Sequence, residues 1–221
     1  MSKKHFLALP VTGDTFAEVR EKNRYYVDKT PYLKAVFSED EAVDDKFLID
    51  GTTVLLLTRP RRFGKTMLMN MFESFLNINY EKPGDTSIQD KFFKGTKILE
   101  DQKFCKKYMG QFSVISITLK DVLGDDFESA YLKLAEVVSA KANEFSFLKE
   151  SPYLNEMEKA KFNLLCDEIY LKKADKQAIS YVTSAIKSLS LMLYKHFNKQ
   201  VYILIDEYDV PLAKAHAKGF H

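Results

Sequence analysis

Three short apolar runs, separated by longer stretches with a helical pattern, restrict the fold of this chain more than any other feature. The runs cover residues 53–58, 112–119 and 201–205 and are rich in β-branched and aliphatic side chains. The first and third runs are nearly continuous, which is typical of strands buried on both faces of a parallel sheet; the second alternates and is expected nearer an edge. Alternating strands and helices predict an α/β fold with a mainly parallel sheet flanked by helices.

Apolar side chains recur every three or four residues in the stretches that follow or separate these runs. This spacing predicts helices over residues 65–76, 128–145 and 179–197. Residues 151–173 are also expected to be mostly helical, and we interpret 146–176 as a helical insertion. The side chains expected to face the core are Met67, Leu68, Met71, Phe72 and Phe75 in the first helix, Ala130, Leu134, Val137 and Val138 in the second, and Ile179, Val182, Ile186, Leu189 and Leu193 in the third.

The composition indicates a packed globular protein with balanced charge. Hydrophobic residues make up 46% of the 221 residues, and 33 basic residues stand against 31 acidic ones, which argues against a dedicated nucleic-acid-binding protein. No linker or repeat marks a boundary, so we expect a single domain over 1–221, with residues 1–50 leading into the first run. No apolar run has the length of a signal peptide or a membrane span, and Cys105 and Cys166 lack ligand-like spacing. These features predict a cytoplasmic protein without a membrane partner.

The loop after the first apolar run carries the clearest chemical motif. Residues 59–66 read Arg-Pro-Arg-Arg-Phe-Gly-Lys-Thr between a predicted strand and a predicted helix, which is the context of a P-loop. Backbone N–H groups and the positive end of the helix dipole bind phosphate at such a site. Gly64 lets the backbone approach the phosphates, Lys65 is expected to reach the β- and γ-phosphates, and Thr66 to coordinate Mg²⁺. The predicted cofactors are ATP and Mg²⁺, and the predicted cofactor-binding residues are Arg61, Arg62, Phe63, Gly64, Lys65, Thr66 and Met67.

This loop departs from the usual P-loop at its start. Arg59 stands where the standard motif has Gly, and Pro60 follows; both restrict φ where Gly would be free. Arg59, Arg61 and Arg62 either add positive charge around a triphosphate or pair with nearby carboxylates. Phosphate at the loop explains these arginines better than association with DNA does.

Two adjacent carboxylates follow the third apolar run. Asp206 and Glu207 after a buried strand form a Walker-B arrangement, which places both at the carboxyl edge of the sheet, where open α/β sheets bind ligands. Asp206 is predicted to hold Mg²⁺ together with Thr66. Glu207 is predicted to polarise the attacking water as general base, so Glu207 and the P-loop lysine are the predicted catalytic residues. Asp209, followed by Pro211, is expected to cap a helix.

Three segments together resemble the AAA-ATPase-like family of bacteria and archaea. They read Tyr-Tyr-Val-Asp-Lys-Thr at 25–30, Leu-Thr-Arg-Pro-Arg-Arg-Phe-Gly-Lys-Thr at 57–66 and Leu-Ile-Asp-Glu-Tyr-Asp at 204–209. The resemblance implies a P-loop NTPase of the additional-strand, catalytic-glutamate type, in which an arginine-rich loop without its first Gly is usual. It implies ATP binding and Mg²⁺-dependent ATP hydrolysis, coupled to conformational change in a larger protein.

The same resemblance carries expectations about neighbouring parts of the site. It implies that residues 26–30 lie near the base or ribose of the nucleotide; the alternative is that Asp28 and Lys29 form a salt-bridged helix cap. A further strand with a polar sensor residue follows Walker B in this fold type, and longer members often carry a C-terminal restriction-endonuclease-like domain. Because the chain ends at His221, we interpret it as truncated after Walker B, with contact to nucleic acid only through such an absent domain.

Three readings of the function stay open at the level of sequence. The first is an ATPase, the second is a nucleotide-binding switch that does not hydrolyse ATP, and the third is an interaction module with a retired site. A GTPase is disfavoured because the sequence shows no Asn-Lys-x-Asp guanine motif. The resemblance also leaves a homo-oligomer open, since ATPases of this broad class often receive an arginine from a neighbouring copy.

Overall fold

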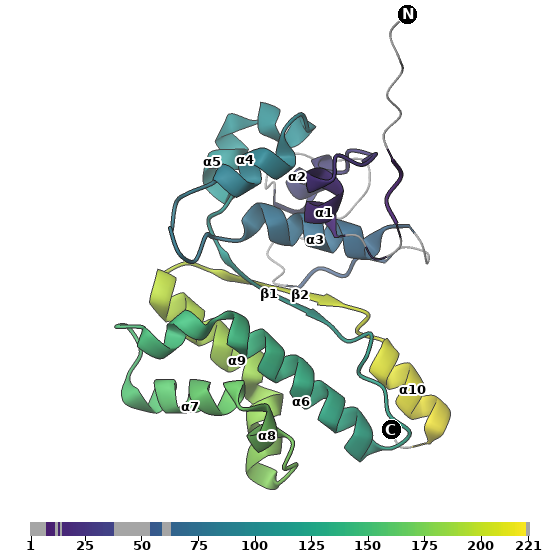
Figure 1. The fold of residues 1–221 in the computed structure, drawn as a ribbon, viewed down its shortest axis with the longest axis vertical. Coiled ribbons are helices and arrows are strands. Elements are labelled where there is room, and N and C mark those ends of the chain that lie inside the picture. The colour runs from purple at the N-terminus through teal and green to yellow at the C-terminus, as the bar shows by residue number, and fades with distance from the viewer. Residues whose placement is uncertain (1–7, 12, 14, 38–53, 59–62, 220–221) are drawn as a thin grey trace, which may run out of the picture. The chain divides into compact units, whose positions relative to one another are not determined.

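The computed structural model describes residues 8–11, 13, 15–37, 54–58 and 63–219. The chain divides into two compact units, Met1–Gln111 and Phe112–His221. Figure 1 shows the elements of each unit, and the two are described separately below.

The described part of the first unit is helical. Its elements are α1 (Phe16–Glu21), α2 (Pro31–Phe37), α3 (Lys65–Leu76), α4 (Ser87–Phe93), the 3-10 helix η1 (Lys97–Glu100) and α5 (Gln102–Tyr108). Helices α1 and α4 both pack on α3 (Figure 1). The core between them is aromatic: the ring of Phe93 lies 4.9 Å from that of Phe16 and 5.2 Å from that of Phe75, and all three side chains are fully buried. This core fixes the position of α3.

Helix α3 has the bounds that the apolar spacing predicts. Leu68, Met71, Phe72 and Phe75 are buried as expected, whereas Met67 is only half-buried because it lies in the exposed first turn. The helix follows Gly64 and ends before Asn77, whose backbone is extended.

The second unit contains a parallel pair of strands and the helices between and after them. Its elements are β1 (Ser113–Thr118), α6 (Phe127–Glu144), the 3-10 helix η2 (Ser146–Glu150), α7 (Glu156–Cys166), α8 (Glu168–Leu171), α9 (Lys176–Phe197), β2 (Val201–Asp206) and α10 (Val210–Lys218). The strands pair in parallel from Ser113 opposite Val201 to Thr118 opposite Asp206. Figure 1 shows α6 to α9 on one side of the two strands. This arrangement agrees with an α/β class, and it confirms that the second and third apolar runs are parallel strands.

The helices of the second unit begin at polar caps that the sequence supplies. Side chains of Asp126, Asn155 and Asp175 accept hydrogen bonds from the first turns of α6, α7 and α9. The helical expectation for residues 151–173 is confirmed by α7 and α8, with a break at Asp167. That residues 146–176 form an insertion stays a prediction.

The buried faces of α6 and α9 are rotated from the predicted ones. In α6 only Val138 of the predicted set is buried; Ala130, Leu134 and Val137 are half-buried, and the buried line follows Tyr131, Ala135, Val138 and Ala142. In α9, Val182, Leu189 and Leu193 are buried, whereas Ile179 and Ile186 are half-buried and Ala178 and Ala185 are buried instead. Small residues belong to the buried line in both helices, and a pattern based on large apolar side chains does not detect them.

Two strand predictions need correction. In the first apolar run the described residues, 54–58, form no strand, and the side chains of Val54 and Leu56 are 76% and 55% exposed. Apolar side chains alone do not form a strand, because a strand also requires a hydrogen-bonded neighbour, and the sheet in the described residues consists of β1 and β2. Strand β2 is not buried on both faces, since Ile203 and Ile205 are 43% and 40% exposed. Alternate side chains of a strand point to opposite faces, so helices on one side cover only one set.

Within the described residues, no helix combines the length and the apolar character that crossing a membrane requires.

Candidate functional site

The N-terminus of α3 is the part of the first unit best suited to bind an anion. Gly64 precedes the helix with φ 74°, a left-handed conformation that glycine adopts without a Cβ clash. The N-cap position is occupied by Gly64, which has no side chain to cap the helix, and the first turn contains no acidic residue. The first N–H groups of a helix have no partner within it and carry a partial positive charge. Helices α6, α7 and α9 place a polar side chain there; α3 begins with Gly-Lys-Thr instead.

A small hollow opens beside this N-terminus. Its volume is about 170 Å³, and the described residues that line it are Lys29, Tyr32, Phe63, Gly64, Lys65 and Leu68. Three of the predicted cofactor-binding residues, Phe63, Gly64 and Lys65, are therefore brought together. Thr66 is exposed in the first turn and Met67 is half-buried. Arg59, Arg61 and Arg62 lie outside the described residues.

The segment that the resemblance connects to the nucleotide reaches this hollow through Lys29. The ammonium of Lys29 donates a hydrogen bond to the carbonyl oxygen of Phe63 at 3.2 Å. The alternative, a helix cap with an ion pair between Asp28 and Lys29, is wrong about the ion pair. The Asp28 carboxylate accepts hydrogen bonds from the backbone N–H groups of Thr30 and Lys97, each at 2.9 Å. The two side chains have separate roles: Asp28 joins backbone segments, and Lys29 contacts the loop.

Tyr32 and Leu68 are lining residues that the motif analysis missed. Tyr32 lies in the first turn of α2, directly after the 25–30 segment, and Leu68 lies one turn into α3. Their spacing from the motif residues could have identified them, because side chains three or four residues apart lie on the same face of a helix.

The two predicted Walker-B carboxylates lie together at the end of β2. Asp206 is the last residue of the strand and pairs with Thr118 at the carboxyl end of β1. One carboxylate oxygen of Asp206, Oδ1, accepts the backbone N–H of Glu207 at 3.0 Å, and the backbone carbonyl of Asp206 accepts the N–H of Leu119 at 3.0 Å. Both acidic side chains are half-buried. The carboxyl ends of parallel strands are where open sheets bind ligands, so this geometry agrees with the position that the sequence predicts.

Glu207 has an unusual backbone. Its φ is 54°, in the left-handed region that residues with a Cβ adopt at a cost. Such conformations persist where the surrounding structure maintains them, and they are concentrated at functional sites. This strain singles out Glu207 among the residues that follow β2.

The prediction that the Asp209 side chain caps a helix is wrong. Helix α10 begins at Val210 with Pro211 in its first turn, as the sequence predicts. However, Asp209 has φ −80° and ψ −19° and makes no side-chain cap hydrogen bond. A capping residue typically has an extended backbone, whereas the backbone of Asp209 is helical.

The described residues contain no cluster of three or more His, Cys, Asp or Glu side chains that would hold a metal ion on its own. The donors that the sequence assigns to Mg²⁺ are the Thr66 hydroxyl and the Asp206 carboxylate. Both are hard oxygen ligands, and magnesium sites commonly use one or two protein oxygens with phosphate and water completing the shell. Each of these two donors, taken by itself, is therefore of a chemical type that Mg²⁺ accepts.

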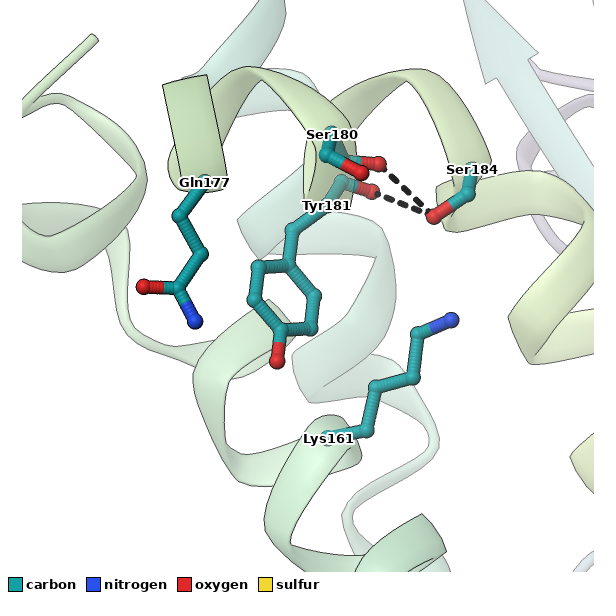
Figure 2. A pocket seen from close by; sticks show the side chains of 5 residues that line it. All are labelled: Lys161, Gln177, Ser180, Tyr181 and Ser184. Atoms are coloured by element: carbon teal, nitrogen blue, oxygen red, sulfur yellow. Dashed lines mark hydrogen bonds between the residues drawn. The ribbon is translucent and has the colours of Figure 1, made fainter. Parts of the chain in front are cut away.

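A second hollow, of about 340 Å³, lies on the second unit between α7 and α9. Figure 2 shows its lining residues, Lys161, Gln177, Ser180, Tyr181 and Ser184. The Ser184 hydroxyl donates back to the carbonyls of Ser180 and Tyr181 at 2.8 and 3.4 Å, and the ammonium of Lys161 lies 5.9 Å from the centre of the Tyr181 ring. The Ser184 hydroxyl is thus bonded within α9 and Lys161 faces the Tyr181 ring, so this hollow is a weaker candidate site than the N-terminus of α3.

Comparison with known proteins concerns both motifs of the predicted site, the Gly-Lys-Thr loop and the acidic pair after β2. No curated protein and no solved structure gave a match. The AAA-ATPase-like family model, described as a predicted AAA-ATPase, matches residues 10–220 and so extends across both units and both motifs. The chain therefore belongs to the AAA-ATPase-like family, which associates it with nucleotide binding.

Proposed function

We propose that this chain binds ATP together with Mg²⁺ and hydrolyses it, with the N-terminus of α3 holding the phosphates. The observation that carries the proposal is the form of this N-terminus: a left-handed Gly64 at the N-cap, a first turn without acidic residues, and Lys65 beside a hollow. A helix N-terminus of this kind attracts phosphate through its N–H groups and its dipole. Membership of the AAA-ATPase-like family supports a nucleotide as the source of that phosphate.

In this proposal each of the predicted catalytic and metal-binding residues has one role. Lys65 binds the β- and γ-phosphates, and Thr66 and Asp206 would hold Mg²⁺ through oxygen atoms. When bound, Mg²⁺ supplies neutralisation of the phosphate charge. Glu207 accepts a proton from the attacking water as general base. Phosphoryl transfer depends mainly on positioning and charge stabilisation, so these roles account for the chemistry that ATP hydrolysis requires.

The coupling of hydrolysis to conformational change in a larger protein is also part of the proposal. It rests on membership of an ATPase-like family. It predicts that the ADP-bound and ATP-bound forms differ in conformation, since a ligand shifts an equilibrium only by its differential affinity for two states.

Isothermal titration calorimetry with Mg²⁺ and ATP tests the binding step. We expect the parent chain to bind and Lys65→Ala to lose about ten-fold or more in affinity, because a charge-assisted contact to phosphate contributes about 1.5–3 kcal/mol. Lys82→Ala is the matched control: it removes a lysine of the same unit whose side chain is 80% exposed. Absence of binding by the parent, or equal binding by Lys65→Ala, would contradict the proposed site.

A further inference from the structure

Lys29 contacts the P-loop backbone where α3 begins. Its Nζ donates to the Phe63 carbonyl at 3.2 Å, and it lies 2.9 Å from the position that a Cβ on Gly64 would occupy. The ammonium therefore fills the space that the absent Gly64 side chain leaves open. Any side chain at position 64 would displace Lys29 and would also strain the left-handed backbone.

The backbone on both sides of Lys29 is held in place. Burial raises the pKa of the Asp28 carboxyl, but hydrogen bonds from the N–H groups of Lys97 and Thr30 outweigh this effect, so its pKa lies below the ordinary value. Thr30 is fully buried, and its hydroxyl accepts the N–H of Ile98 at 3.2 Å. Residues 28 and 30 are thus fixed to η1, so Lys29 extends from a rigid segment and not from a free loop.

The same segment is joined to α3 at a second point. The backbone N–H of Lys29 donates to the Tyr26 hydroxyl at 3.2 Å, and that hydroxyl donates to Met71 Sδ on α3, also at 3.2 Å. Burial raises the pKa of Tyr26 to about 12, so the hydroxyl keeps its proton. The segment therefore contacts α3 in its second turn through Tyr26 and contacts the residue preceding Gly64 through the Lys29 side chain.

We propose that Lys29 is a phosphate-side positioning residue: it holds the Phe63–Gly64 turn and adds a second cation beside Lys65 for the polyphosphate of a nucleotide. The hydrogen bond to Phe63 fixes the turn that orients the first N–H groups of α3. The charge lies where an anion is expected, since Lys29 and Lys65 line the same hollow. This inference rests on the proposed nucleotide site and assigns Lys29 to the phosphates, whereas the family resemblance implies that its segment lies near the base or ribose.

The test compares two ligands that differ in the nucleoside. Calorimetry measures the affinity for Mg–ATP and for Mg–tripolyphosphate, which has no base or ribose. The proteins compared are the parent and the variants Lys29→Met, Lys29→Arg and Lys82→Met. We expect Lys29→Met to weaken both ligands by the same factor, about ten-fold, and to reduce the salt dependence of binding, because it removes one charge from the phosphate contacts. Lys29→Arg keeps the charge and a donor and should retain most of the affinity. Lys82→Met should match the parent.

Each other outcome has a distinct meaning. Weaker binding of ATP with unchanged binding of tripolyphosphate would overturn the phosphate assignment and place Lys29 at the nucleoside. Unchanged affinity for both ligands would overturn the inference while leaving the nucleotide site in place, provided that Lys65→Ala loses binding. A parent chain that binds neither ligand would overturn the proposed function itself, and the inference with it. Circular dichroism checks the fold of each variant, and if Lys29→Met does not fold, Lys29→Gln, which is neutral but keeps an N–H donor, takes its place.

Discussion

At the residue scale, Glu207 combines a strained backbone with a proposed chemical role. A residue with a Cβ at φ 54° costs about 1 kcal/mol relative to glycine. We therefore expect Glu207→Gly to raise the free energy of unfolding by about 1 kcal/mol relative to Glu207→Gln, which keeps the Cβ. Both variants should lose about 100-fold or more in turnover, because neither can accept the proton of the attacking water. Urea denaturation and phosphate release measure the two effects.

These two measurements also separate the alternative functions. A parent that binds Mg–ATP but releases no phosphate would indicate a nucleotide-binding switch. Turnover by Glu207→Gln at the parental rate would exclude Glu207 as the general base.

We expect His196 to make the stability of the second unit depend on pH. Its Nδ1 lies 2.7 Å from the Ser151 hydroxyl oxygen, and its ring contacts those of Phe147 and Phe197, at centroid distances of 5.1 and 4.5 Å. Burial lowers the pKa of His196 below its ordinary value of 6.5. The unfolded chain then binds the proton more tightly, so this contribution to stability is complete above pH 6.5 and is lost as the pH falls through 6.5 towards the lower folded-state pKa.

We therefore expect the free energy of unfolding to decrease between about pH 7 and 5.5, and to decrease less in His196→Gln. Urea titrations at each pH measure it. Equal slopes for the parent and His196→Gln would show that other groups cause the dependence.

At the element scale, the turn between α8 and α9 is the clearest place where a substitution should stabilise the chain. Ala174 has φ 54°, next to Asp175, whose side chain caps α9. Ala174→Gly should raise the free energy of unfolding by about 0.5–1 kcal/mol, because glycine adopts this backbone without a steric cost. The control Ala140→Gly, at an exposed position inside α6, should lower it by about 1 kcal/mol. Chemical denaturation measures the change in the free energy of unfolding of each variant. A loss of stability in Ala174→Gly would contradict the argument.

At the scale of the whole molecule, ligand binding and stability are linked. A ligand that binds only the folded state stabilises it by about 2.7 kcal/mol at a free concentration 100 times its Kd. Mg–ATP should therefore raise the midpoint of thermal unfolding of the parent, and Lys65→Ala should show a much smaller rise at the same concentration. An unchanged midpoint for the parent under saturating Mg–ATP would favour an interaction module with a retired site.

Local chemistry made much of this molecule predictable. The 3.6-residue spacing located α3 to the residue and α6 and α9 within a few residues, because a helix forms from contacts between residues close in sequence. The apolar runs at 112–119 and 201–205 likewise located β1 and β2. The site motifs were also local: Gly-Lys-Thr opens α3, and Asp206 and Glu207 follow β2 directly. Their roles in binding and catalysis stay predictions.

By itself, the sequence determined the positions of α3, α6, α9 and the two strands, where the Gly-Lys-Thr and acidic motifs lie next to them, and which family the chain resembles. Only the tertiary structure decided that residues 54–58 form no strand, that Ile203 and Ile205 are exposed, and that Lys29 donates to the Phe63 carbonyl. The physical reason is that burial and strand pairing depend on neighbours distant in sequence. Lys29 and Phe63 are 34 residues apart, and no periodicity along the chain specifies that such a pair will meet.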